Sequence, residues 1–130
     1  MILYRLIETP EFDFLPPETA ISFNVGGQIF DSNVEIITQD PHSILAACCR
    51  KIPIKLPDSV TGLIYFDRDW WLFRHIIAFL RSKVLPSELE TLKELYIEAS
   101  FYRLESLQRA IEEVPLDQIS NLSPYIANTW

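Results

Sequence analysis

The sequence predicts one folded domain that combines short β-strands, mainly in its first half, with α-helices in its second half. Three observations support this prediction. Apolar residues alternate over 21–25, as in a half-buried strand, and Gly26-Gly27 then separates two β-prone segments. Apolar residues between 72 and 80 recur at helical spacing. With 130 residues, the chain has the length of a single domain with short extensions.

The composition of residues 1–20 predicts an N-terminal arm that packs on this domain or on a partner. Pro10, Pro16 and Pro17 are incompatible with a long helix or a regular strand. The same stretch carries more apolar side chains than a fully solvated tail needs. We therefore separate it from the domain that follows.

The first strand is expected over 21–25, and the second begins at Gln28 after the glycine turn. Asp40 followed by Pro41 resembles a helix N-cap with proline at the first helical position. This pattern predicts a helix that starts there and continues to Cys48.

Residues 50–62 are expected to form an irregular loop between the first helix and the next strand. Prolines and charged residues interrupt any regular apolar pattern there. Residues 63–66 follow as a short strand candidate. Asp69 is placed to cap the next helix, which carries a broad apolar stripe. We expect that helix to end near Ser82.

Ser87 and Glu90 have the spacing of a capping box, which predicts a helix start at Ser87. A last helix is expected over 103–113, and Pro115 ends it. Beyond this proline, apolar residues at a spacing of three or four predict a weak amphipathic segment. They are Leu116, Ile119, Leu122, Tyr125 and Ile126.

The charge balance excludes two classes of partner. Eleven Lys and Arg against eighteen Asp and Glu give a net charge of −7, so there is no basic footprint for nucleic acid or for an anionic membrane surface. No apolar run approaches the roughly 20 residues of a membrane span, and the N-terminus lacks a secretory layout. We expect an intracellular, cytoplasmic protein. A mean hydropathy of +0.11 suggests that a second subunit covers some apolar surface.

The inventory of reactive residues does not suggest an enzyme. His42 with Cys48 and Cys49 is too small a set for a zinc site, so no metal or cofactor is expected. The two adjacent cysteines are expected to be buried, reduced thiols. No phosphate-loop pattern follows Gly26-Gly27, and no nucleophile and base pattern supports a small hydrolase.

Two features around residue 70 have alternative interpretations. Asp67 and Asp69 can be viewed as paired acids, although capping and salt bridges with Arg68 fit them better. Adjacent residues of a helix point about 100° apart. Trp70 and Trp71 are therefore either one buried and one partly exposed core residue or the anchor of a protein interface.

Four motifs in order resemble the BTB/POZ domain of the potassium-channel tetramerisation type. They are FNVGGQIF at 23–30, YFDRD at 65–69, FRHIIAFLR at 73–81 and EASFYRL at 98–104. The resemblance covers about residues 21–113, leaving the arm at 1–20 and a C-terminal extension at 114–130. It implies an α+β fold, with a small three-stranded sheet packed with about four to five helices.

The chain departs from the family pattern in three places. Trp70 stands where the family usually has proline, and Ile36-Ile37 stands where a Thr-Leu pair is usual. The cysteine pair of zinc-bridged channel domains comes late in the fold, whereas Cys48-Cys49 falls in the first predicted helix. That intersubunit zinc site is therefore not carried over.

The resemblance implies a non-catalytic module that self-associates into a ring of four or five subunits. Many soluble relatives are substrate adaptors for cullin-based ubiquitin ligases, so the alternative function is recruitment of a cullin. The sequence supplies candidate subunit contacts, and they are Asp67, Arg68, Asp69, Arg74, Arg81 and Tyr102. The candidate partner contacts are Trp70 and Trp71, with residues 52–62.

Each candidate contact has an ordinary alternative. The charged residues can equally serve as intrachain caps and surface ion pairs. For Phe101, Tyr102 and Leu104 core packing is favoured, with the Tyr102 hydroxyl group as the atom that reaches a neighbouring subunit.

Overall fold

In a computed structural model of the chain, the structure describes residues 13–120. The first twelve residues of the predicted arm and the last ten of the predicted extension lie outside the described residues. The chain divides into two compact units, a first that ends at Trp70 and a second that begins at Trp71. Each unit is described by itself.

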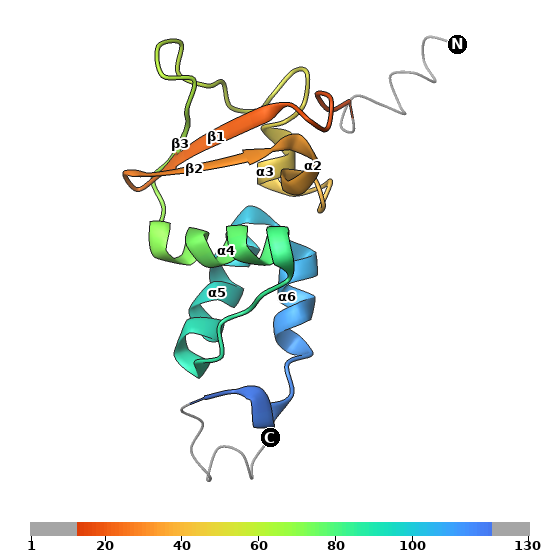
Figure 1. The fold of residues 1–130 in the computed structure, drawn as a ribbon, viewed down its shortest axis with the longest axis vertical. Helices are drawn as coiled ribbons and strands as arrows, with labels where there is room; N and C mark the ends of the chain where they lie inside the picture. The colour runs from red at the N-terminus through yellow and green to blue at the C-terminus, as the bar shows by residue number, and fades with distance from the viewer. Residues whose placement is uncertain (1–12, 121–130) are drawn as a thin grey trace, which may run out of the picture. The chain divides into compact units, whose positions relative to one another are not determined.

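The first unit contains a three-stranded sheet in the order β2-β1-β3 (Figure 1). β1 (Ala20–Val25) pairs antiparallel with β2 (Gln28–Asn33), placing Phe23 opposite Phe30. β3 (Ile64–Phe66) pairs parallel with β1 on its other side. The three predicted strands and their turn are confirmed, as is the sheet that the family resemblance implied.

The turn between β1 and β2 depends on its two glycines. Gly26 and Gly27 both have positive φ angles, 55° and 99°, which side chains with a Cβ rarely adopt. The side-chain oxygen of Asn24 accepts a hydrogen bond from the Gly27 amide at 2.9 Å. Along β1, the side chains of Ile21, Phe23 and Val25 are buried, which is the face that the alternation predicted.

Two short helices follow in the first unit. α2 (Val34–Ile37) is capped by Asn33, whose side-chain oxygen accepts a hydrogen bond from the Ile36 amide. This helix was not predicted, because four residues rich in β-branched side chains do not show a helical period. α3 (Ile44–Ala47) corresponds to the predicted first helix but is shorter than the predicted stretch from Asp40 to Cys48.

The predicted start of α3 is wrong. Its cap is Ser43, whose hydroxyl oxygen accepts a hydrogen bond from the Ala46 amide at 3.0 Å. Asp40 instead accepts from the Ser43 amide through its backbone carbonyl, so Asp40 and Pro41 belong to a turn before the helix. Aspartate and proline are common both at helix N-termini and in turns. The backbone hydrogen bond from Ser43 to Asp40 shows that here they form a turn.

Helices make up the second unit. α4 (Trp70–Ser82) begins directly after Asp69 and ends at the predicted residue. α5 (Leu89–Tyr102) and α6 (Glu105–Glu112) contact each other, and a short 3-10 helix, η2 (Leu116–Gln118), follows. The described residues thus contain five α-helices with the sheet, an α+β fold as expected.

Two helix ends differ from the predictions. The capping box at Ser87 does not form, because α5 is preceded by Glu88 without a side-chain cap. Ser87 accepts a hydrogen bond from the Ser120 amide instead. Arg103 does not begin the last helix but ends α5 in the left-handed conformation, with φ 60°, and α6 begins at Glu105.

Apolar side chains fill the interior of each unit. In the second unit, the fully buried ones with no measurable exposure are Phe73, Ile76, Leu95, Ala99, Tyr102, Leu104 and Leu107. Their spacing within α4 and α5 follows the helical period. Among residues 13–120, no helix combines the length and apolar character needed to cross a bilayer.

Candidate interaction surface

The glycine turn and the Asp67–Asp69 corner meet in space although forty residues separate them. The Gly26 amide donates to the Phe66 carbonyl at 3.0 Å. A Cβ atom added to Gly26 would lie 2.5 Å from the carbonyl oxygen of Arg68, far inside a van der Waals contact. Two of the four motifs are therefore parts of one rigid structure.

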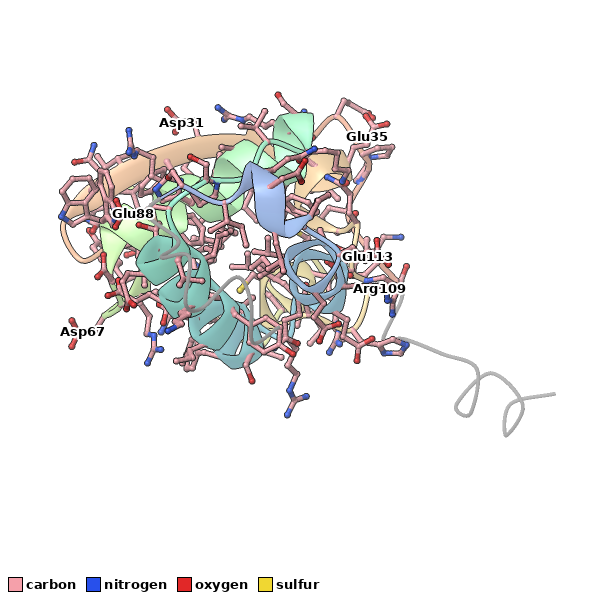
Figure 2. All side chains as sticks on the ribbon, turned by 90° about the horizontal axis from the view of Figure 1, so that it is seen from below. Asp31, Glu35, Asp67, Glu88, Arg109 and Glu113 are labelled. Atoms are coloured by element: carbon pink, nitrogen blue, oxygen red, sulfur yellow. The ribbon has the colours of Figure 1, made fainter. Side chains whose placement is uncertain are left out.

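The corner presents charged side chains from this rigid backbone. Asp67 and Asp69 are exposed, and Arg68 is half-buried. Figure 2 shows the Asp67 side chain pointing away from the ribbon. An acid, a base and an acid in three successive residues can set the register of a protein contact, because charges at an interface contribute to orientation and specificity.

The two tryptophans do not follow the expectation of one buried and one partly exposed residue. Trp70 is 43% exposed and Trp71 is 42% exposed. The prediction from helix geometry is wrong because both side chains lie at the edge of the buried stripe. The alternative, that one of them anchors an interface, stays a prediction.

Trp71 organises the start of α4. The guanidinium carbon of Arg74 lies 4.2 Å from the centroid of its ring, within the range of a cation–π contact. The His75 ring meets it edge-on, with centroids 5.1 Å apart. Burial, and then the charge of Arg74, lower the pKa of His75.

Arg74 and Arg81 share one face of α4. Both are exposed, and a separation of seven residues is almost two full helical turns. Their spacing along the helix is roughly 10 Å. This face can offer two positive charges to acidic groups of another chain.

Tyr102 is placed differently from the other candidate contacts. Its side chain is fully buried, with its ring 5.6 Å from that of Phe73 and 4.9 Å from that of Phe101. The prediction of core packing for Phe101, Tyr102 and Leu104 agrees with the burial of the last two and is wrong for Phe101. Phe101 keeps 39% of its surface exposed. Because a side chain buried within one chain presents no surface to a second, we leave Tyr102 out of the proposed interface.

Cys48 and Cys49 are buried, free thiols, as expected. Their sulfur atoms donate to the carbonyls of Ile44 and Leu45, one helical turn earlier. Burial raises the pKa of Cys48 to about 11 and that of Cys49 to about 12. In the part of the chain that the structure describes, no group of three or more His, Cys, Asp or Glu could hold a metal ion.

The structure shows two apolar surfaces, of which the sequence had indicated the first, through residues 52–62, as a candidate partner contact. The first is the aliphatic loop, which we define as residues 50–62. Its strongly exposed aliphatic side chains are Ile52, Ile54, Leu56 and Val60. The second is a groove of about 720 Å³ bounded mainly by α5 and α6. The apolar spacing after Pro115 was a sequence signal for it, whereas the exposure of Ile97 is seen only in the structure.

Comparisons with known proteins give a consistent assignment. Residues 21–113 match the family model described as the BTB/POZ domain. The chain is 34% identical over 96 residues to mouse BTB/POZ domain-containing protein KCTD21, covering 72% of this chain and 36% of the relative. It is also 34% identical over 95 residues to the Arabidopsis thaliana FH protein interacting protein FIP2, covering 72% and 32%.

A third relative is the mouse potassium channel regulatory protein, 40% identical over 91 residues, with 67% of this chain and 33% of the relative covered. The chain thus spans about a third of the length of these three curated relatives. The family match includes the four motifs, the three-stranded sheet and all five described α-helices. The chain therefore belongs to the BTB/POZ family of the potassium-channel tetramerisation type, whose domains are generally non-enzymatic modules for oligomerisation and protein interaction.

Proposed function

We propose that this chain is a non-catalytic homo-oligomerisation module that forms a ring of four or five subunits and presents surfaces to partner proteins. The family supports self-association in general. The observation that carries the proposal for this chain is the Asp67–Asp69 corner, an exposed charged segment held rigidly against the glycine turn.

The physical route to a ring is head-to-tail contact. When one surface of a subunit binds a different surface of the next, the assembly closes if the rotation per subunit divides a full turn. Such a contact needs a fixed backbone, because ordering a mobile loop on binding costs entropy. The Gly26 backbone contact supplies this rigidity at the corner. Arg74 and Arg81 offer a second charged surface on α4.

The direct test is the mass of the full chain in solution. Sedimentation velocity and light scattering across micromolar concentrations should give a species of four or five times the 15.1 kDa of one chain. A monomer at all concentrations would rule out the ring, and a stable dimer would rule out its proposed size.

A second candidate function is recruitment of a cullin-family ubiquitin ligase, and the aliphatic loop favours it. Ile52 is 84% exposed and Val60 is 91% exposed, and large exposed apolar side chains gathered in one segment are typical of a protein contact. Trp70 and Trp71 are the other candidate partner contacts. We place this activity inside the cell, in the cytoplasm, where free thiols such as Cys48 and Cys49 are the rule.

The cullin proposal is tested by titrating the full chain with purified cullin in a calorimeter. We expect binding to weaken at least tenfold in the Ile52→Asp variant. The matched control is Ser59→Asp, which adds the same charge at an exposed polar position of the same loop. No binding by the unmodified chain, or equal loss in both variants, would contradict the proposal.

A further inference from the structure

The groove between α5 and α6 is an apolar surface that the proposed function does not use. α5 contributes Leu89, Leu92 and Ile97, and α6 contributes Ile111. Ile97 is 69% exposed, which leaves a large aliphatic side chain in water. A volume of about 720 Å³ is in the range of pockets that bind organic ligands or peptide side chains.

The two helices that form the groove are fixed to each other by polar contacts. The Tyr96 hydroxyl donates to a carboxylate oxygen of Glu112 at 2.6 Å, and the Gln108 side-chain amide donates to the Tyr96 carbonyl at 3.4 Å. Pairing residue 96 with 108 and 112 means that α6 runs back along α5. The groove is thus formed before anything binds to it.

The chain itself leads into this groove. After Pro115, the side chains of Leu116 and Ile119 line it. The Ser120 amide then donates to the Ser87 carbonyl at 2.7 Å, beside the start of α5. Ser120 and Glu88 form a parallel bridge, so the chain at Ser120 runs in the direction of the chain that enters α5.

The residues after Ser120 have the composition of an occupant. Positions 121–130 contain no Asp, Glu, Lys or Arg, in a chain of which 22% is charged. Leu122, Tyr125 and Ile126 continue the apolar spacing of Leu116 and Ile119. An uncharged stretch with large apolar side chains is poorly suited to remain in water.

We propose that residues 122–126 of the same chain bind in the α5–α6 groove and cover Ile97. Extended residues advance about 3.3 Å each, so six residues beyond Ser120 reach roughly 20 Å, about the length of the 14-residue α5. Covalent attachment gives this segment a high effective concentration at the groove. A second copy of the chain must compete with it.

The test is methyl NMR on the full chain with labelled Ile and Leu methyl groups. We expect nuclear Overhauser cross-peaks between the Ile126 methyl and the methyls of Ile97 and Ile111. In the Leu122→Asp/Ile126→Asp variant these cross-peaks should vanish, and the thermal midpoint should fall by several degrees. The matched control, Asn121→Asp/Asn128→Asp, adds the same two charges at polar positions. It should keep the cross-peaks and the thermal midpoint of the unmodified chain.

Three results would overturn the proposal. The first is the absence of these cross-peaks in the unmodified chain. The second is an equal fall in thermal midpoint for the apolar variant and its control. The third is cross-peaks seen only between chains, in an isotope-filtered experiment on mixed labelled and unlabelled protein, which would make a second copy the occupant. The mass in solution tests the ring separately, since neither variant changes the corner or α4.

Discussion

The backbone of Gly26 packs directly on the carbonyl group of Arg68, leaving no room for a side chain. A Cβ on Gly26 would meet the Arg68 carbonyl oxygen at 2.5 Å. The contact joins the β1–β2 turn to the charged corner, so the conformation of one determines the position of the other. The need for glycine at position 26 is thus explained by the backbone of the Asp67–Asp69 corner.

Replacing Gly26 by alanine should therefore destabilise the chain strongly. The substitution adds left-handed strain, about 1–2 kcal/mol, and a backbone clash that forces the turn or the corner to move. We expect the free energy of unfolding to fall by about 3 kcal/mol or more, measured by urea denaturation. Gly62→Ala is the matched control, because Gly62 has a φ of 73° with nothing within 4 Å of the added Cβ. A loss no larger than that of the control would contradict the contact.

Charge reversal on α4 should weaken the proposed assembly. In Arg81→Glu, a positive group of the proposed interface becomes negative, and like charges across an interface cost several kcal/mol. We expect the dissociation constant of the assembly to rise at least tenfold by sedimentation. Arg109→Glu is the matched control, because Arg81 and Arg109 each lie in the last turn of their helix. Each substitution therefore removes a positive charge that stabilises a helix C-terminus. Figure 2 labels Arg109 on α6 and Glu113 just after the end of that helix. Equal effects in both variants would place the interface elsewhere.

His75 should make the stability of the fold depend on pH. Its pKa in the folded chain lies below the ordinary 6.5, first because of burial and then because of Arg74, and its Nε2 has no hydrogen-bond partner among the described residues. A lowered folded pKa means that the unfolded chain binds the proton first, so stability falls as the pH drops below about 6.5. We expect the His75→Asn variant to show a smaller fall between pH 7 and pH 5 by urea denaturation. The same slope in both proteins would contradict the assignment.

Much of the fold follows from local patterns in the sequence. The β1–β2 hairpin has alternating apolar residues and two glycines at the only positions that need positive φ. α4 has enough length and apolar periodicity to determine its own bounds from Trp70 to Ser82. In both elements, the apolar pattern and the conformational preferences of the residues favour the same structure. The local sequence is therefore enough to predict them.

The helix starts and the interaction surface depend on partners that are distant in the sequence. Ser87 has the spacing of a capping residue, yet its carbonyl binds the Ser120 amide, and no local pattern reports a contact across 33 residues. The exposure of Trp70 and Trp71 depends on which side chains fill the stripe of α4. The contact between Gly26 and Arg68 likewise depends on the pairing of β1 with β3, which lie about forty residues apart in the sequence.

The buried thiols should react slowly in the folded chain. Thiolate is the reactive form, and burial raises the pKa of Cys48 to about 11 and that of Cys49 to about 12 from 9.0. A rise of two pKa units lowers the thiolate fraction about 100-fold at pH 8, and burial limits access further. We expect alkylation by iodoacetamide to be at least about 100-fold slower than in urea, followed by mass spectrometry. Rapid modification of the folded chain would show that α3 opens readily.

The cap of α3 offers a direct test of where that helix begins. Ser43 is buried and its hydroxyl oxygen accepts from the Ala46 amide, so Ser43→Ala leaves that amide without its partner. The expected loss in the free energy of unfolding is about 1–2 kcal/mol. Ser87→Ala is the control, because Ser87 is exposed, and its hydroxyl contacts only the Ser120 hydroxyl among the contacts described; its loss should stay within about 0.5 kcal/mol. If urea denaturation gave the larger loss for Ser87→Ala, the capping box would be restored and the start of α3 would need revision.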